Sequence, residues 1–153
     1  EQMYGDKGQV PEGEYLIPMG VAKVKRKGTD VTIVSFGKII KEAFKAADEL
    51  AIQGIEAEVI DLRTVRPIDY DSIIKSVKKT NRLVVLEESW PLGSIATEIA
   101  FKIQKDAFDF LDAPIKRVTC LDTPMAYAPT LVEAFLPNKD KLIEAVKEVT
   151  YSK

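Results

Sequence analysis

The chain of 153 residues contains 22 basic and 24 acidic residues, a net charge of −2, with 46% hydrophobic residues. This composition is typical of one globular domain, and it has no excess of positive charge that would indicate binding to nucleic acid or an anionic membrane. A single cysteine, Cys120, excludes an internal disulfide and fits a reducing compartment. The chain has no histidine, which removes Ser–His–Asp and Cys–His catalysis and the commonest zinc ligand.

The predicted elements alternate between strands and helices along most of the chain. Short β-branched apolar runs predict strands, and apolar residues spaced by three and four predict helices. In chain order, we expect an extended leader over 1–20, a charged edge strand over 21–28 and an apolar strand over 30–37. A helix over 38–53 stopped by Gly54, a strand over 57–62, a helix capped by Asp69 and a strand over 82–88 should follow. The last part should contain a helix from Ser94 to Phe108 or Phe110, a strand over 115–121, a short helix over 131–135 and a final helix from Asn138. This order predicts an α/β fold of three layers, in which a mostly parallel sheet of about five strands carries helices on both faces.

The segment VIDLRTVRPID, residues 59–69, has two readings. In the functional reading, Asp61 is a catalytic carboxylate at a strand end, and Arg63 and Arg66 clamp an anion. In the structural reading, Pro67 ends the extended segment, Asp69 caps the next helix and the two arginines pair with nearby acids. We favour the structural reading because turn chemistry accounts for every residue of the segment.

The carboxyl ends of the other strands give weak signals for a nucleotide or anion site. The first apolar strand ends in SFGKII, which lacks the glycines of the dinucleotide and P-loop motifs. Glu87 and Glu88 end the third predicted apolar strand, 82–88. Adjacent residues on a strand point to opposite faces, so we expect one of the two to accept backbone or arginine hydrogen bonds at the sheet end and the other to be solvated. The SWPLGS loop leads to a helix N-terminus that is either an anion site or an ordinary connection.

Two loop segments are unusually rich in apolar side chains. FDFLDAPIKRV and LDTPMAYAP contain Phe108, Phe110, Leu111, Met125 and Tyr127. Exposed, these residues would form a patch for a protein partner; buried, they would belong to the core. Both readings stay open. Cys120 lies in an apolar run, which indicates a buried, unreactive thiol.

A string of motifs resembles the C-terminal half of the β subunit of pyruvate dehydrogenase E1, a domain of the transketolase C-terminal type. The resemblance covers the chain from about Val10. It rests on VPEGEYLIPMGVAKVKRKGTDVTIVSFG, AEVIDLRTVRPID, TNRLVVLEESWP, FDFLDAPIKRVT, DTPMAYAP and LP. The ordered set is typical of oxoacid dehydrogenase β subunits, and FLDAP and PMAYA with the later LP favour pyruvate. Two departures, Ala126 for a frequent proline and PLGSIATE for a glycine-rich stretch, concern the subunit interface.

The resemblance implies that the parent enzyme contains two α and two β chains and uses thiamine diphosphate and Mg²⁺. That enzyme decarboxylates pyruvate and transfers the acetyl group to lipoyl groups of E2, in the bacterial cytoplasm or the mitochondrial matrix. The cofactor and the catalytic groups would lie outside this chain, which we expect to be inactive alone and to bind no cofactor. Residues 1–20 would then be a linker from an N-terminal domain, and 21–153 the transketolase C-terminal-like domain, in agreement with a chain that opens on Glu1 instead of methionine.

The resemblance also assigns an assembly role to this chain. Its implied partners are the E1 α subunit, a second β subunit and the peripheral subunit-binding domain of E2, without nucleic acid or membrane. Asp112 and the C-terminal carboxylate at Lys153 would bind the E2 domain. The expected subunit-interface residues are Trp90, Phe110, Met125 and Tyr127.

Other functions remain open at this point. The same domain could come from a branched-chain oxoacid dehydrogenase, an acetoin dehydrogenase or another transketolase relative. A different class would be a free-standing α/β module that binds a nucleotide or anion at the strand ends, near Asp61 and Ser94.

Overall fold

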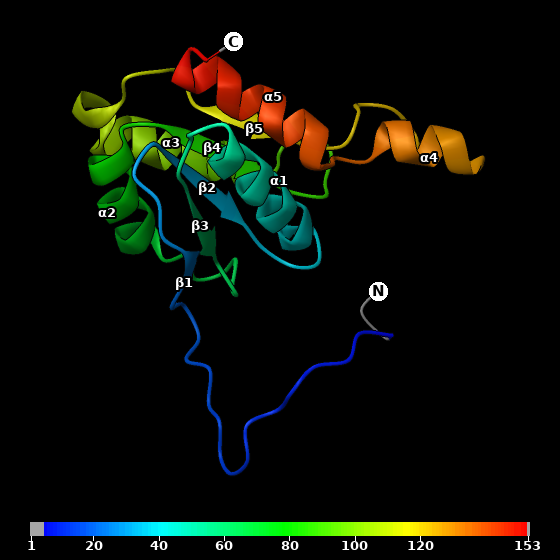
Figure 1. Ribbon diagram of the computed structural model, residues 1–153, viewed down its shortest axis with the longest axis horizontal. Helices are drawn as coiled ribbons and strands as arrows, with labels where there is room; N and C mark the ends of the chain where they lie inside the picture. The colour runs from blue at the N-terminus through cyan, green and yellow to red at the C-terminus, as the bar shows by residue number, and fades with distance from the viewer. Residues whose placement is uncertain (1–4, 153) are drawn as a thin grey trace.

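A five-stranded sheet forms the centre of the protein, and the computed structural model describes residues 5–152 (Figure 1). The strand order is β1-β3-β2-β4-β5. The strands are β1 (Lys23–Arg26), β2 (Val31–Ser35), β3 (Ala57–Asp61), β4 (Leu83–Leu86) and β5 (Lys116–Val118). Only β1 pairs antiparallel with its neighbour among these strands, so the predicted, mostly parallel sheet with a charged edge strand is confirmed.

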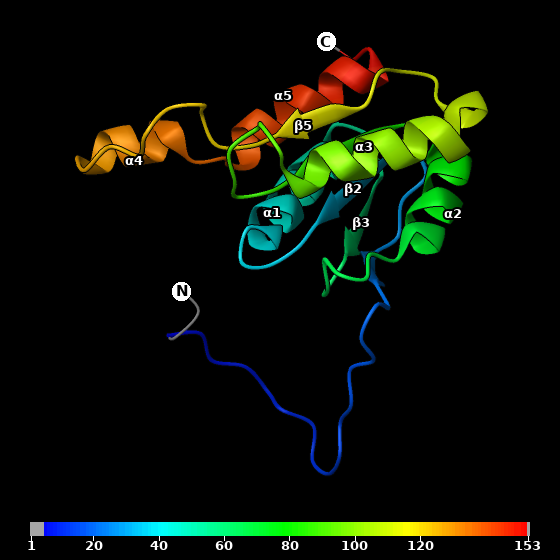
Figure 2. The same ribbon diagram turned by 180° about the vertical axis from the view of Figure 1, so that it is seen from behind.

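Helices cover both faces of the sheet (Figures 1 and 2). They are α1 (Ile40–Ile52), α2 (Tyr70–Thr80), α3 (Ile95–Asp106), α4 (Pro129–Phe135) and α5 (Lys139–Thr150), with a 3₁₀ turn η1 (Phe108–Phe110) after α3. Apolar side chains of α1 and α5 pack in one hydrophobic cluster on the sheet, and those of α2 and α3 pack in a second. The three-layer α/β prediction is confirmed.

The central strands are apolar on both sides because both sides are covered. Ile33 faces the cluster of α1 and α5, whereas its neighbour Val34 faces the cluster of α2 and α3. β4 repeats the pattern with Val84 and Val85. The uninterrupted apolar runs in the sequence therefore reflect alternating burial in two cores.

Local signals at helix ends act as expected. The Asp69 carboxylate accepts a hydrogen bond of 3.0 Å from the backbone N–H of Ser72 and one of 2.9 Å from that of Ala22. Burial opposes the charged form, but hydrogen bonds from Ser72 and Ala22 lower the pKa of Asp69 overall. The Asn138 side chain caps α5 in the same way, and Gly54 adopts a positive φ of 82° after α1.

One helix ends earlier than the sequence predicts. α3 stops at Asp106, because Ala107 leaves the helical region with φ −142°, and η1 is a separate turn. Asn81, at the end of α2, donates a side-chain hydrogen bond of 2.9 Å to the carbonyl of Phe110. The backbone carbonyl of Asn81 also accepts a hydrogen bond of 2.9 Å from the backbone N–H of Asp112. These contacts with a distant helix end turn the chain away from the axis of α3.

The segment at residues 59–69 is a structural corner. The Asp61 carboxylate accepts a hydrogen bond of 3.0 Å from the backbone N–H of Arg63, which has a positive φ of 59°. The expected ion pairs are wrong: within residues 5–152, neither Arg63 nor Arg66 pairs with a carboxylate. A second hydrogen bond within the corner, of 3.1 Å, runs from the Thr64 hydroxyl to the carbonyl of Pro67.

The first described segment, residues 5–20, forms no helix or strand and runs away from the sheet (Figure 1). It exposes Val10, Leu16 and Met19. Gly20 makes contact with the corner, since its N–H donates a hydrogen bond of 3.0 Å to the Thr64 hydroxyl.

Candidate functional site

The candidate site residues fall into two groups at opposite ends of the sheet. Phe110 and Asp112 precede β5 and therefore lie at its amino end. Trp90 follows β4, and Met125 and Tyr127 follow β5, so these three lie at the carboxyl end. The sequence suggested one aromatic cluster, but β5 carries the chain from one end of the sheet to the other between the two loop segments.

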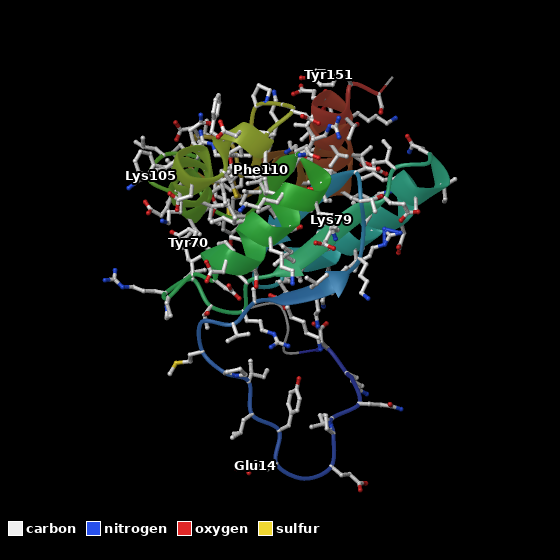
Figure 3. The ribbon with its side chains drawn as sticks, turned by 90° about the vertical axis from the view of Figure 1, so that its left-hand side faces the viewer. Glu14, Tyr70, Lys79, Lys105, Phe110 and Tyr151 are labelled. Atoms are coloured by element: carbon white, nitrogen blue, oxygen red, sulfur yellow. The ribbon has the colours of Figure 1, made fainter. Side chains whose placement is uncertain are left out.

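The amino-end group forms what we call the Asp112 surface, made of Phe108, Phe110, Asp112 and Tyr151. All four side chains are exposed. Figure 3 shows Phe110 and Tyr151 on the same side of the protein. Exposed aromatic side chains of this kind are enriched at protein interfaces, and the Asp112 carboxylate adds a charge to the same surface.

The Asp112 surface is held by contacts with two other parts of the chain, the end of α2 and the end of α5. Arg82 donates a hydrogen bond of 2.9 Å to the carbonyl of Val149, and its guanidinium lies 3.7 Å from the Asp112 carboxylate. The Tyr151 hydroxyl donates a hydrogen bond of 3.2 Å to the backbone carbonyl of Asp112. Lys78 lies 4.8 Å from the centre of the Phe110 ring, within cation–π range. The backbone is thus fixed while the Asp112 carboxylate remains 57% exposed.

Two members of the carboxyl-end group, Met125 and Tyr127, lie on what we call the Tyr127 arm, residues 121–136, which contains α4. The arm projects from the three layers in both views (Figures 1 and 2). A hydrogen bond of 3.1 Å from the N–H of Leu121 to the carbonyl of Phe135 closes its base. Tyr127 is fully exposed, and Met125 and Leu131 are more than half exposed.

The Trp90 loop lies beside the base of this arm. The Trp90 indole donates a hydrogen bond of 3.0 Å to the carbonyl of Thr123. Trp90, Met125, Cys120 and Phe135 line a largely apolar pocket of about 220 Å³. The sequence left open whether the apolar residues of the two loop segments are exposed or buried. In the structure Phe108, Phe110, Met125 and Tyr127 are exposed, whereas Leu111 packs against the core. Exposed apolar patches of this kind are a common feature of protein interaction surfaces.

The strand ends do not offer a free anion site. Glu87 is fully buried, and its carboxylate oxygens accept hydrogen bonds of 3.2 and 3.3 Å from the backbone N–H of Ala96 in the first turn of α3. Ser94 caps the same helix. Glu88 is exposed, as expected. The helix N-terminus already has an internal carboxylate, so the geometry does not support the nucleotide or anion module at Ser94.

Cys120 is not a catalytic thiol. It is buried, as predicted, and burial together with the charge of Glu88 raises its pKa. Residues 5–152 contain no group of three His, Cys, Asp or Glu side chains arranged to hold a metal ion. No helix in this described range is long and apolar enough to cross a membrane. The predicted contact at Lys153 lies outside the described residues.

Sequence reasoning missed the residues that hold the Asp112 surface. Asn81, Arg82 and Tyr151 were not among the predicted site residues, although the first is the left-handed end of α2, with φ 60°. After glycine, asparagine is a residue found at such left-handed helix ends, so the position of Asn81 between a predicted helix and a predicted strand was a usable signal. No local signal shows that Arg82 reaches Val149 and Asp112, because these contacts depend on the tertiary fold.

Comparison with known proteins identifies the family. A model of the transketolase C-terminal domain family matches residues 20–142. The chain therefore belongs to the transketolase C-terminal domain family. Among solved structures, a split-gene transketolase described as an inactive β4 tetramer superposes with a TM-score of 0.81 at 26% identity, over 95% of this chain and 48% of that one.

Curated relatives are considerably longer than this chain. The pyruvate dehydrogenase E1 component subunit β of Rhizobium meliloti (strain 1021) is 48% identical over 99% of the chain, which covers 33% of that protein. The acetoin:2,6-dichlorophenolindophenol oxidoreductase subunit β of Bacillus subtilis (strain 168) is 47% identical over 95% of the chain and 43% of that protein. The mitochondrial pyruvate dehydrogenase E1 β subunit of Dictyostelium discoideum is 49% identical over 93% of the chain, covering 40% of its length. The chain thus spans less than half the length of these relatives.

Proposed function

We propose that this chain is the assembly and docking domain of the β subunit of a thiamine-diphosphate-dependent pyruvate dehydrogenase E1. The observation that carries this proposal is 48% identity to a pyruvate dehydrogenase β subunit over 99% of the chain. The parent enzyme decarboxylates pyruvate oxidatively and passes the acetyl group to lipoyl groups of E2. The relatives include bacterial and mitochondrial proteins, which supports the bacterial cytoplasm or the mitochondrial matrix as its location.

Catalysis in this proposal belongs to the part of the enzyme outside the chain. The residues present do not fit thiamine diphosphate with Mg²⁺: the described part, 5–152, has no metal-ligand cluster, and the N-terminus of α3 is occupied by Glu87. The family match begins at residue 20, which supports residues 1–20 as the linker and 21–153 as the domain. Alone, the chain would be inactive and would bind no cofactor.

The proposed docking site for the E2 peripheral subunit-binding domain is the Asp112 surface. Its carboxylate is exposed and its backbone is fixed, so a basic group of a partner meets a preorganised charge. The contact with Arg82, at 3.7 Å and partly exposed, contributes little to stability. Asp112 is therefore available for binding without loss of the fold.

Asp112→Asn is expected to weaken binding of the E2 domain by about 30-fold, corresponding to about 2 kcal/mol, because the partner's basic group loses its charged acceptor. The free energy of unfolding should change by less than about 1 kcal/mol. Isothermal titration calorimetry measures the first quantity and urea unfolding the second. The matched control is Asp109→Asn, which removes the same charge from an exposed residue of the neighbouring turn η1. Equal affinities for the two variants would reject Asp112 as the docking residue.

The proposed contact with the other subunits uses Trp90, Met125 and Tyr127, with Phe110 at the opposite end of the sheet. The exposed aromatic and Met side chains support this, as does the β4 assembly of the split-gene transketolase. In the parent enzyme the partners would be a second β subunit and the α subunit, in a tetramer of two α and two β chains.

Tyr127→Ser is expected to lower the affinity between copies of this chain without lowering its stability, since the side chain has no intramolecular burial to lose. Sedimentation velocity over a range of concentrations measures the association. Tyr15→Ser serves as the control, because Tyr15 is an exposed tyrosine of the leader. Unchanged association in Tyr127→Ser would place the contact elsewhere.

Acetoin dehydrogenase is the second candidate, since the Bacillus subtilis relative is as similar as the pyruvate dehydrogenases. Turnover of pyruvate against acetoin by the complete αβ enzyme separates the two. Branched-chain oxoacids in the same assay test the remaining relative of this class.

A further inference from the structure

A pocket of about 430 Å³ lies between β1 and α2, away from both surfaces described above. Three lysines line it: Lys27, just after β1, and Lys75 and Lys79, one turn apart on α2. Figure 3 shows Lys79 beside α2 on this side of the protein. The remaining lining comes from Val24, Glu58, Ser72 and Ser76.

The floor of the pocket is a satisfied polar network. Glu58 is buried. Its carboxylate accepts a hydrogen bond of 2.6 Å from the Ser76 hydroxyl and forms an ion pair with Lys79. Ser76 in turn lies 2.6 Å from the Thr32 hydroxyl, and Thr32 lies 2.6 Å from that of Thr80. Glu58 and Lys79 thus neutralise one another, and the floor is rigid because every group in it has a partner.

The two other lysines leave the pocket with positive charge. Within residues 5–152, neither Lys27 nor Lys75 has an ion-pair partner. Lys79 is paired with Glu58, so the uncompensated charges of the lining are those of Lys27 on one element and Lys75 on another. The fold therefore brings two lysines without ion-pair partners in the described chain to one concave site, where an anion would compensate their charge.

We propose that the Lys27–Lys75 pocket is a binding site for a phosphate group. Ammonium groups are common phosphate ligands, and a pocket of this volume is within the range of small-ligand sites. Val24 and the methylene stems of the lysines provide an apolar wall for the organic part of a phosphate ester. The site depends on residues 24–79 only, and its existence is independent of the proposed E1 function.

The test is a titration of the chain with inorganic phosphate, followed by NMR of the lysine side chains and the α2 amides. Sodium chloride holds the ionic strength constant, so general charge screening does not change during the titration. We expect saturable shifts at Lys27, Lys75 and Ser76. Phosphate should also raise the midpoint of thermal unfolding, because it binds the folded state only.

The decisive variant is Lys27→Gln/Lys75→Gln, which should weaken phosphate binding by at least about tenfold. It should fold normally, since neither side chain has an intramolecular ion pair to lose within the described chain. The control is Lys7→Gln/Lys105→Gln, which removes the same charge from two exposed lysines outside the pocket. Shifts that rise linearly without saturation, or equal affinity in the two double variants, would overturn the proposal and leave non-specific charge screening as the explanation.

Discussion

Gly28→Ala is expected to lower the free energy of unfolding by about 4 kcal/mol, near the upper end of single-residue effects. Gly28 is buried between β1 and β2, where the chain passes over the start of β3. A Cβ at this position would lie 2.2 Å from the carbonyl carbon of Ala57 and 2.3 Å from the backbone nitrogen of Glu58. Both atoms belong to a central strand, so no flexible side chain can move aside.

The backbone around Gly28 has little freedom to adapt. The N–H groups of Thr29 and Asp30 donate hydrogen bonds of 2.9 and 3.0 Å to the carbonyl of Glu56, and the Asp30 carboxylate accepts one of 2.6 Å from the N–H of Glu56. Moving the turn away from β3 to admit a methyl group would lengthen all three. The expected loss therefore combines a steric term with weakened hydrogen bonds.

Two other glycines provide controls of graded severity. Gly8→Ala should change the free energy of unfolding by less than about 0.5 kcal/mol, since its Cβ would meet nothing within 4 Å. Gly54→Ala should cost about 1 kcal/mol, because that position has free space but a positive φ of 82°. Urea unfolding monitored by circular dichroism ranks the three variants. A Gly28→Ala variant as stable as Gly54→Ala would show that the turn adapts more easily than its contacts indicate.

The elements were predictable where the signal is local. Apolar alternation is absent in β2 and β4 because both sides are covered, and this pattern predicted central parallel strands. Asp69 and Asn138 precede their helices and cap them as expected. The short edge strand β1 was also recognisable, because lysines at sheet edges are common.

The prediction failed where distant residues decide the local structure. The early end of α3 depends on Asn81, which lies 29 residues before Phe110. The two aromatic loops lie at opposite ends of the sheet because β5 runs between them, and the predicted strand over 115–121 already implied this separation. The contacts of Arg82 with Val149 and Asp112 join segments that have no common pattern in the sequence.

The carboxylate of Glu87 is fully buried. The sequence predicted that one of the two glutamates accepts backbone or arginine hydrogen bonds at the sheet end, but not that the donor is the backbone N–H of Ala96 in the first turn of α3. Glu87 carries a charge into the core, which is costly unless the charge is compensated. Both its oxygens lie within hydrogen-bonding distance of the Ala96 N–H, at the positive end of the α3 dipole. The carboxylate thus replaces the solvent that would otherwise satisfy the first turn of α3.

Glu87→Ala is expected to lower the free energy of unfolding by about 3 kcal/mol, because it leaves the buried Ala96 N–H unpaired and opens a cavity under α3. Relief of the desolvation of the charge offsets part of this loss, but an orphaned donor and a cavity together exceed it. Glu87→Gln is the matched control: its amide oxygen still accepts from Ala96 and its size is kept, while the attraction between the charge and the helix dipole is lost, so we expect a loss of about 1 kcal/mol. Denaturant unfolding of the two variants measures the difference. If Glu87→Gln were as destabilised as Glu87→Ala, the negative charge would be the stabilising feature, and the hydrogen bond with its packing would contribute little.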